Sequence, residues 1–336
     1  MFNQTQKLNP KLSVMSASDL DNLIEQKPTR DGFGEALLRL GEQDERIVVL
    51  TGDLKESTRV QAFADKFPDR FVECGVAEQN MMGVAAGLAL AGKIPFAASY
   101  ATFSPGRNWD QFRVSVCYSK ANVKVVGAHT GVSVGPDGAT HQALEDIAIT
   151  RVLPNLTVLQ PIDAIEASKA VVAMSDIDGP VYIRLTREKS PVITTQDSPF
   201  EIGKANILRD GTDVAIIGCG PILYNAIKAA IELEKQNISV LIINNHTIKP
   251  IDKNTILWAA KLTKAVVTVE EHQIDGGLGS AVAEVLARNY PVPVEMVGMP
   301  NTFGESGTPE ELFEKYGMGV QSIVKSIKKV ISRKQS

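Results

Sequence analysis

The sequence predicts an α/β protein of two domains, each built on a mostly parallel sheet covered by helices. Short apolar segments rich in β-branched residues alternate with segments of helical periodicity. The alternation stops once, near 195–202, where Pro, Ser, Thr and Asp occur without helical periodicity, and then resumes. A chain of 336 residues with 44% hydrophobic side chains is also long enough for two separate cores. We therefore expect domains at 28–195 and 202–336, preceded by an arm at 1–27.

The arm is polar apart from one amphipathic patch, SASDLDNLIEQK. In the first domain the patterns predict, in chain order, a helix in RDGFGEALLRLGEQD, a strand in RIVVLTGD, a buried helix in VAEQNMMGVAAGLALAG, strands in KIPFAASYATF and NVKVVGAH, a helix beginning in HQALEDIAI, and strands in LTVLQP and VYIRLTR. Thr140 is expected to cap the helix in HQALEDIAI, because its hydroxyl can accept a hydrogen bond from a free backbone N–H.

The second domain repeats the same alternation. We expect strands in DVAIIGCG, SVLIINNHTIKPID, KAVVTVEEH and VPVEMVGMP, with helices in YNAIKAAIELEKQ and SAVAEVLARN. No internal repeat of solenoid period is visible in the chain.

Composition excludes several classes of function. The net charge is −4 and basic residues are scattered, which argues against nucleic acid or an anionic membrane as the main partner. No apolar run reaches the roughly 18 residues of a spanning helix, and the N-terminus lacks a signal-peptide pattern. Three cysteines without CxxC or metal-ligand spacing read as thiols in a reducing compartment. We expect a cytoplasmic protein with no metal site of its own.

Histidine and glycine are concentrated in GAHTGVSVGPDGATHQALED, residues 127–146, which holds two of the four histidines. His129 ends a predicted strand, and Asp137 and His141 follow in a glycine-rich loop. Ligands of open α/β sheets collect beyond the carboxyl ends of strands, and imidazoles there can exchange protons with hydroxyl and carbonyl oxygens. A turn with a satisfied core histidine is the plainer interpretation, and pattern alone leaves the two about equal. The other histidines, His246 and His272, are expected to be structural.

The same segment resembles a loop of transketolases that runs from a His through G-x-G-x-D-G-x-T-H-Q. Other segments match that family in the same order, from about residue 28 to the end: PTRDGFGEAL, GDLKEST, FVECGVAEQNMMGVAAGLAL, RLTREKSP, TIKPID and EEHQIDGGLGSAVAE. The resemblance implies a thiamine-diphosphate-enzyme pyrimidine-binding fold followed by a transketolase C-terminal domain.

The resemblance also implies roles for particular residues. Glu78 takes the place of the catalytic glutamate that hydrogen-bonds the aminopyrimidine of thiamine diphosphate. His129 and His141 would contact donor oxygens and assist proton movement, and Asp137 would accept from an aldose hydroxyl. The terminal phosphate of a sugar phosphate would be held by Arg30, Ser57 and Arg187.

The sequence departs from the family in the aromatic platform for the aminopyrimidine. Phe103 matches a family Thr-Phe, but SPGRNWDQFR is about two residues shorter than usual; the resemblance implies Trp109 as a further stacking partner. Gln79 stands where a histidine is common.

A larger departure is the lack of the Gly-Asp-Gly…Asn motif that holds Mg²⁺ and the diphosphate in the family. The chain therefore resembles the C-terminal half of a split transketolase. We expect a separate N-terminal subunit that carries the diphosphate and Mg²⁺, and an α2β2 heterotetramer. The arginines and serine at the phosphate end indicate sugar phosphates of the pentose phosphate pathway as substrates, and a specialised catabolic sugar is the alternative.

Rival interpretations stay open at this stage. Half of a 1-deoxyxylulose-5-phosphate synthase has a similar loop, but usually with Asp where His129 stands. The β subunits of 2-oxoacid dehydrogenases are a looser match. A non-catalytic regulatory module of a thiamine enzyme has little reason to keep Glu78, Asp137 and both histidines of the loop. A nicotinamide-binding protein is disfavoured because no clear G-x-G-x-x-G lies between a strand and a helix.

Overall fold

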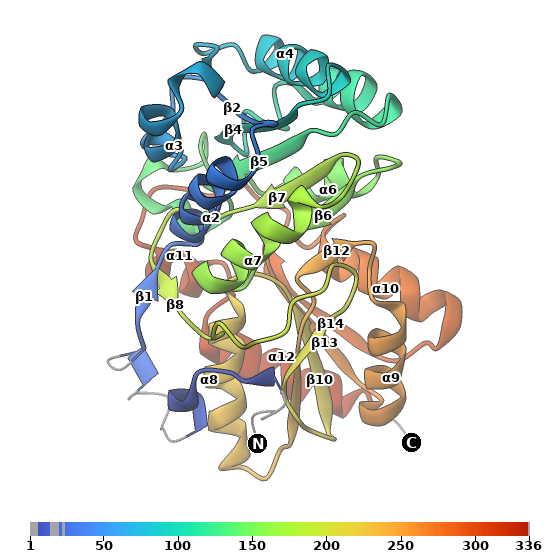
Figure 1. The fold of residues 1–336 in the computed structure, drawn as a ribbon. Helices are drawn as coiled ribbons and strands as arrows, with labels where there is room; N and C mark the ends of the chain where they lie inside the picture. Colours follow the sequence, from blue (N-terminus) through green and yellow to red (C-terminus); the bar gives the residue numbers. More distant parts are fainter. Residues whose placement is uncertain (1–5, 14–19, 22–23, 335–336) are drawn as a thin grey trace.

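Two mostly parallel sheets, one in each half of the chain, form the framework of the protein (Figure 1). The computed structural model describes residues 6–13, 20–21 and 24–334. The predicted α/β class with two layered domains is confirmed. Residues 192–205 contain no helix or strand, and the predicted boundary at 195–202 falls inside this connection.

The first sheet has seven strands in the order β12-β6-β7-β5-β4-β2-β3. All neighbours run parallel except β12, which is antiparallel to β6. The strands are β2 (Ile47–Thr51), β3 (Phe71–Glu73), β4 (Ile94–Tyr100), β5 (Lys124–Ala128), β6 (Thr157–Leu159), β7 (Val181–Arg184) and β12 (Thr247–Lys249). Strands β2, β4, β5 and β7 carry continuous apolar runs because both faces of this sheet are covered.

Different helices cover the two faces of this sheet. On one face, α2 (Thr29–Gln43), α3 (Gln61–Lys66) and α7 (Ala164–Ser175) share a core with the strands. On the other lie α4 (Glu78–Leu90), α5 (Trp109–Gln111), a π-helical segment (Phe112–Tyr118) and α6 (Asp146–Arg151). Short 3₁₀ segments lie at Pro68–Arg70 and Val132–Asp137.

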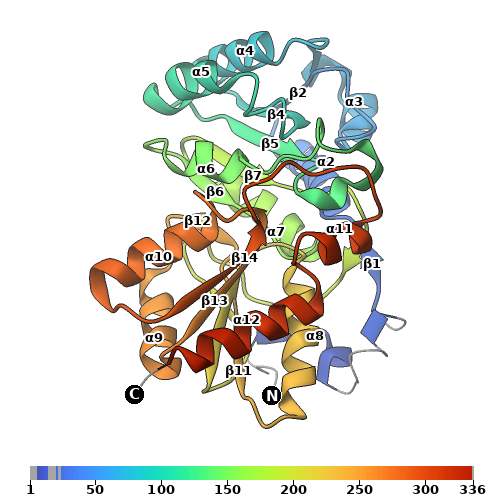
Figure 2. The same ribbon diagram turned by 180° about the vertical axis from the view of Figure 1, so that it is seen from behind.

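The second sheet has five strands in the order β14-β13-β10-β11-β9, with only β9 antiparallel to its neighbour. Its strands are β9 (Asn206–Arg209), β10 (Val214–Gly218), β11 (Val240–Asn244), β13 (Val266–Gln273) and β14 (Val294–Met299). One face is covered by α8 (Leu223–Glu234) and α12 (Val320–Ser332), which lie side by side in Figure 2, and the other by α9 (Lys253–Thr263) and α10 (Leu278–Asn289). Helix α11 (Pro309–Lys315) contacts the 3₁₀ segment of the first domain.

A cluster of buried apolar residues spans the two halves. A single cluster of buried residues contains Met82 and Phe112 from the first half together with Ile217 and Leu241 from the second. Strand β12 also crosses over, since it follows β11 in the chain but joins the first sheet beside β6. From the sequence, this strand is predicted to continue β11 in the second domain, and that prediction is wrong. The halves are therefore tied together by backbone pairing as well as by burial.

The described part of the arm lies against the second half. Leu12, Leu20 and Ile24 are buried in the core cluster that contains α8 and α12. A two-stranded ladder then pairs β1 (Gln26–Lys27) with β8 (Ser190–Pro191). A 3₁₀ turn occupies Pro10–Ser13, and much of the amphipathic patch predicted for the arm lies outside the described residues.

Two local predictions were wrong. The segment around α4 was expected to be buried all round, but Gln79, Asn80, Gly83 and Leu90 are exposed and line its outer face. The helix expected in HQALEDIAI is present, but it begins at Asp146 instead of directly after Thr140, and Thr140 does not cap it. Instead Gln142 Nε2 donates to the carbonyl oxygens of Val132 and Glu305, which keeps this segment in an irregular loop.

Candidate active site

The carboxyl ends of the parallel strands of the first sheet form one wall of a cavity of about 380 Å³. Tyr100 ends β4, His129 directly follows β5, and Arg187 follows β7. Helix α2 contributes Arg30, and the segment after β2 contributes Ser57. The cavity is lined by Arg30, Glu56, Ser57, Arg59, Tyr100, His129, Asp137 and Arg187. Five of the six residues predicted to bind substrate thus share one cavity, as expected for the active edge of a parallel sheet.

His129 is held rigidly between an aromatic ring and a cation. Its backbone adopts a left-handed conformation (φ 58°) that turns the chain off the end of β5. The imidazole is buried and stacks on Tyr100, with ring centroids 3.8 Å apart. Its Nε2 lies 3.4 Å from Arg30 Nη1. Burial, together with the charges of Arg30 and Arg187, lowers the pKa of His129 to about 3.

His141 lies beside this cluster, outside the residues that line the cavity. Its ring meets Tyr100 edge-on at 5.9 Å and Phe103 at 5.6 Å between centroids. Its Nδ1 is 2.9 Å from the Thr140 hydroxyl. The two predicted catalytic histidines are therefore joined through Tyr100, which the sequence analysis did not select. An aromatic residue at the end of a central strand was the signal that could have found it.

Three guanidinium groups converge on the cavity. Arg30 donates to the Ser57 carbonyl oxygen (2.8 Å), and Arg187 donates to the Val134 carbonyl oxygen (2.9 Å) and lies 3.4 Å from Asp137 Oδ1. Burial and the neighbouring charge of Arg59 lower the pKa of Arg30. The buried Arg30 Nε has no partner among the described residues. Arg59, which is paired with Asp31, was missed by sequence reasoning.

The second half of the chain supports the glycine-rich loop. Glu271, at the end of β13, accepts hydrogen bonds from the Ser133 backbone N–H (2.9 Å) and hydroxyl (2.7 Å). Gly131 passes so close that a Cβ there would lie 1.7 Å from Glu271 Oε2, and its φ of 80° also favours glycine. The loop that carries Asp137 is therefore fixed by a carboxylate from the other half of the chain.

Glu78 is the first residue of α4. Its side chain is buried, whereas the outer face of the helix is exposed. Its Oε2 accepts a hydrogen bond from Arg107 Nη1 at 2.7 Å. Its Oε1 is buried without a partner among the described residues. Asn108 Nδ2 donates to the Glu78 carbonyl oxygen (3.2 Å) and to the Ser104 hydroxyl oxygen (3.0 Å). A buried acid with one unsatisfied oxygen is the kind of group that a ligand donor completes.

The two predicted aromatic residues occupy different surroundings. Phe103 is partly buried and stacks with Tyr100 at 6.0 Å, while the Arg107 guanidinium lies 4.6 Å from its centroid. Trp109 packs against the shared core and donates its indole N–H to the Ile149 carbonyl oxygen at 2.8 Å. No ring contact joins Trp109 to Phe103 in the described part of the chain. A stacking role for Trp109 stays a prediction.

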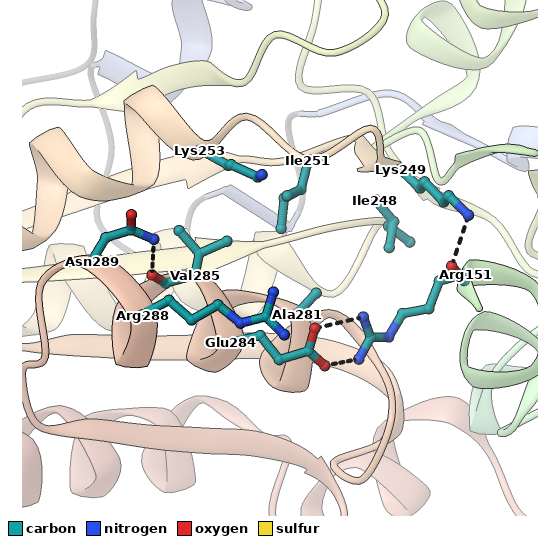
Figure 3. Close-up of a pocket in the computed structure, with 10 residues that line it drawn as sticks. All are labelled: Arg151, Ile248, Lys249, Ile251, Lys253, Ala281, Glu284, Val285, Arg288 and Asn289. Atoms are coloured by element: carbon teal, nitrogen blue, oxygen red, sulfur yellow. Dashed lines mark hydrogen bonds and ion pairs between the residues drawn. The ribbon is translucent and has the colours of Figure 1, made fainter. Parts of the chain in front are cut away.

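A separate pocket of about 170 Å³ lies between the two halves, where Arg151 faces residues of β12 and α10 (Figure 3). Arg151 bridges its mouth by pairing with Glu284 of α10, and Lys249 Nζ donates to the Arg151 carbonyl oxygen (Figure 3). None of the predicted site residues lines this pocket. These bonds serve to join α6 to α10 and β12.

The described residues lack two kinds of feature. They contain no group of three His, Cys, Asp or Glu side chains placed to hold a metal ion. They also contain no helix with the length and apolar character needed to cross a membrane.

The fold and site define a class of two-domain proteins: a mostly parallel α/β domain with a buried acid at the start of a helix, joined to a second mostly parallel α/β domain. Comparisons agree with this class. The model of the transketolase pyrimidine-binding domain matches residues 25–192, and the model of the transketolase C-terminal domain matches residues 203–323. The chain belongs to the transketolase family.

Similar proteins include half-length members of the family. A putative transketolase C-terminal section of Methanocaldococcus jannaschii is 45% identical over 90% of this chain and 95% of its own length. A 6-deoxy-6-sulfo-D-fructose transketolase subunit of Clostridium sp. is 42% identical over 93% and 97%. A solved split-gene transketolase, described as an inactive beta4 tetramer, aligns with a TM-score of 0.86 and 46% identity over 92% of this chain and 99% of that one. The chain thus corresponds to the C-terminal half of a split transketolase.

Proposed function

We propose that this chain is the C-terminal subunit of a thiamine-diphosphate-dependent transketolase, which transfers a two-carbon ketol unit from a ketose phosphate to an aldose phosphate. The observation that carries the proposal is Glu78, a buried carboxyl at the start of α4 with one oxygen unpartnered. Phe103 lies nearby and has an aromatic face. Arg107 contacts both residues, because it donates a hydrogen bond to Glu78 and its guanidinium lies over the Phe103 ring. These two groups fit the donor edge and the face of an aminopyrimidine.

The cofactor supplies, when bound, a nucleophilic carbon and an electron sink that no side chain provides. This chain would bind its aminopyrimidine through Glu78 and Phe103, with Trp109 as a further aromatic candidate. The diphosphate and Mg²⁺ would be held by a separate N-terminal subunit, because this sequence lacks the motif for them. The substrate would then lie between the two chains.

Different residues in and around the cavity would bind different parts of the substrate. His129 and His141 lie around Tyr100 and would exchange hydrogen bonds with the oxygens of the two-carbon unit. Asp137, held by Arg187, would accept from an aldose hydroxyl. Arg30, Ser57 and Arg187, joined here by Arg59, would bind the terminal anion, for which planar guanidinium groups are well suited. The Clostridium relative is named for a sulfonated sugar, so phosphate and sulfonate need separate tests.

The outer face of α4 supports the assembly part of the proposal. Val76 and Leu90 flank this helix at 70% and 73% exposure, and Tyr118 of the adjoining π-helical segment is 82% exposed. Both views place α4 on the outside of the first domain (Figures 1 and 2). Exposed apolar side chains of this kind favour a protein contact, and we assign it to a second copy of the chain in an α2β2 enzyme. Three free cysteines fit the reducing cytoplasm in which we place that enzyme.

The test is reconstitution with the N-terminal subunit recovered by pull-down from the native lysate. Neither subunit alone should transfer ketol units, and the complex should do so with thiamine diphosphate and Mg²⁺ present. A Glu78→Gln complex should assemble but lose at least about 100-fold in turnover. Paired assays with phosphorylated, sulfonated and unsubstituted ketoses then identify the terminal group. Transfer activity in the isolated chain, or full turnover in the Glu78→Gln complex, contradicts the proposal.

A further inference from the structure

Arg107 bridges the two residues assigned to the aminopyrimidine. Its Nη1 donates to Glu78 Oε2 at 2.7 Å, and its guanidinium carbon lies 4.6 Å from the centre of the Phe103 ring. The Arg107 side chain is 47% exposed, whereas that of Glu78 is 1% exposed. The arginine thus reaches from the surface to cover a buried acid.

A buried carboxylate needs such a partner. An ionised carboxyl removed from water is stable only when it is paired or hydrogen-bonded. Arg107 is the one cation paired with Glu78 in the described part of the chain. In a subunit that has not yet met its cofactor, Arg107 therefore supplies the contact without which Glu78 would be an uncompensated buried charge.

A guanidinium and an aminopyrimidine present the same chemistry to this site. Both are planar, both place N–H donors at one edge, and both can lie against an aromatic face. Arg107 uses its edge on Glu78 and lies within cation–π range of Phe103. An aminopyrimidine that paired with the free Oε1 of Glu78 would still have to lie against Phe103, over whose ring the Arg107 guanidinium now lies.

We propose that Arg107 occupies the aminopyrimidine position in the cofactor-free subunit and leaves it when thiamine diphosphate binds. This inference rests on the proposed function, because that function assigns Glu78 and Phe103 to the cofactor. Arg107 is then a positioning residue that keeps the Glu78 pocket formed until the cofactor arrives.

The local structure permits this exchange. The neighbouring Asn108 is buried and fixed by its bonds to Ser104 and to the Glu78 carbonyl, so the backbone beside Arg107 is anchored. The Arg107 backbone N–H is also bonded to the Phe103 carbonyl oxygen at 2.8 Å. The half-exposed side chain, in contrast, reaches Glu78 through one hydrogen bond. The side chain can therefore swing into solvent without moving the backbone that shapes the pocket.

The first measurement is thermal unfolding of the full chain alone. Arg107→Ala should unfold at a lower temperature than the wild type, because Glu78 is left unpaired. The double variant Arg107→Ala/Glu78→Gln should recover most of that loss. Added 4-amino-2-methylpyrimidine should raise the midpoint of Arg107→Ala more than that of the wild type, and should not raise that of the double variant. An equal response of all three proteins overturns the inference.

The second measurement is thiamine diphosphate affinity in the reconstituted complex, followed by calorimetry. Removing a competing side chain should tighten binding, so Arg107→Ala should lower Kd by at least about 3-fold even though it destabilises the free chain. Arg107→Gln serves if the alanine variant fails to fold. An unchanged or raised Kd overturns the inference, because Arg107 would then be a surface ion pair or a direct cofactor ligand. Failure of the wild-type complex to bind the cofactor overturns the proposed function as well.

Discussion

Arg30 Nη1 lies 3.4 Å from His129 Nε2 in the wall of the cavity. A guanidinium can only donate hydrogen bonds, so Nε2 must be the unprotonated nitrogen and Nδ1 carries the proton. The buried Nδ1 has no partner among the described residues. With its pKa lowered to about 3 by burial and by Arg30, the ring is neutral under ordinary conditions.

A neutral His129 leads to a prediction about the pH profile. Replacing it with Asn should lower kcat/KM of the complex by about 100-fold through loss of the imidazole. The acidic limb of the profile should remain at the same pH, because His129 does not gain a proton between about pH 5 and pH 8. Steady-state rates across that range provide the measurement. If the acidic limb disappears in His129→Asn, the neutral assignment is wrong.

Among the groups of the substrate, Arg30 should bind the terminal anion alone. Arg30→Met should raise KM for a phosphorylated ketose by about 10- to 100-fold, the strength of a charged hydrogen bond. KM for the same sugar without its phosphate should be unchanged. Arg39→Met is the matched control on the same helix, because Arg39 is exposed and bonded to Ser168. An equal rise for both sugars contradicts the assignment.

His272 predicts a loss of stability in acid. Its Nδ1–H donates to the Gln273 carbonyl oxygen (2.7 Å), and its Nε2 accepts from the Ala148 N–H (3.3 Å). The neutral ring is thus fully bonded, and burial lowers its pKa to about 4. Since the unfolded chain has a histidine pKa of about 6.5, it binds the extra proton first, and stability falls as pH drops below that value.

His272→Gln should remove the loss of stability in acid that His272 causes. Between pH 7 and about pH 5 the variant should lose about 2 kcal/mol less stability than the wild type, measured by urea unfolding. Above about pH 7.5 the difference between the two proteins should not change with pH, which is the internal control. Glu270, whose pKa burial raises to about 7, titrates in the opposite sense, so the two proteins must be compared at each pH. Parallel pH curves would contradict the prediction.

Much of the fold and of the cavity could be predicted from the sequence, because both depend on local patterns. Parallel strands bring their carboxyl ends to one edge, so residues after β5 and β7 had to meet there. His129, Asp137 and Arg187 were accordingly found together. The family resemblance then supplied the assignments of Arg30 and Ser57.

The missed features depend on contacts between distant parts of the chain. Strand β12 looks like an extension of β11 in the sequence, and nothing local indicates that it pairs with β6, far earlier in the chain. Arg107 reads as an ordinary surface arginine until its guanidinium is placed on Glu78. Gly131 is required because Glu271, from the second half, lies where a Cβ would be. Periodicity and turn residues carry no information about such pairs.

The last prediction concerns a buried ion pair of the first half, whose arginine also bonds to the second half. Arg184 and Asp146 have side chains 0% and 1% exposed, with Arg184 Nε 2.8 Å from Asp146 Oδ2. The Tyr182 hydroxyl also donates to this oxygen at 2.7 Å. Arg184 Nη2 reaches across to the Glu271 carbonyl oxygen in β13, again at 2.7 Å. Asp146 therefore neutralises the charge that binds the first sheet to the second.

Asp146→Asn should lower the free energy of unfolding by about 3 kcal/mol, because removing one partner of a buried pair leaves the other charge uncompensated. Asp44→Asn is the control, since it removes a partly exposed pair with Arg46 and should cost less than about 1 kcal/mol. Urea midpoints for the two variants measure the difference. The double variant Asp146→Leu/Arg184→Met should recover part of the loss, because apolar groups of similar volume avoid the buried charge. Equal midpoints for Asp146→Asn and Asp44→Asn would show instead that water reaches Arg184 and that the halves are held together by apolar packing.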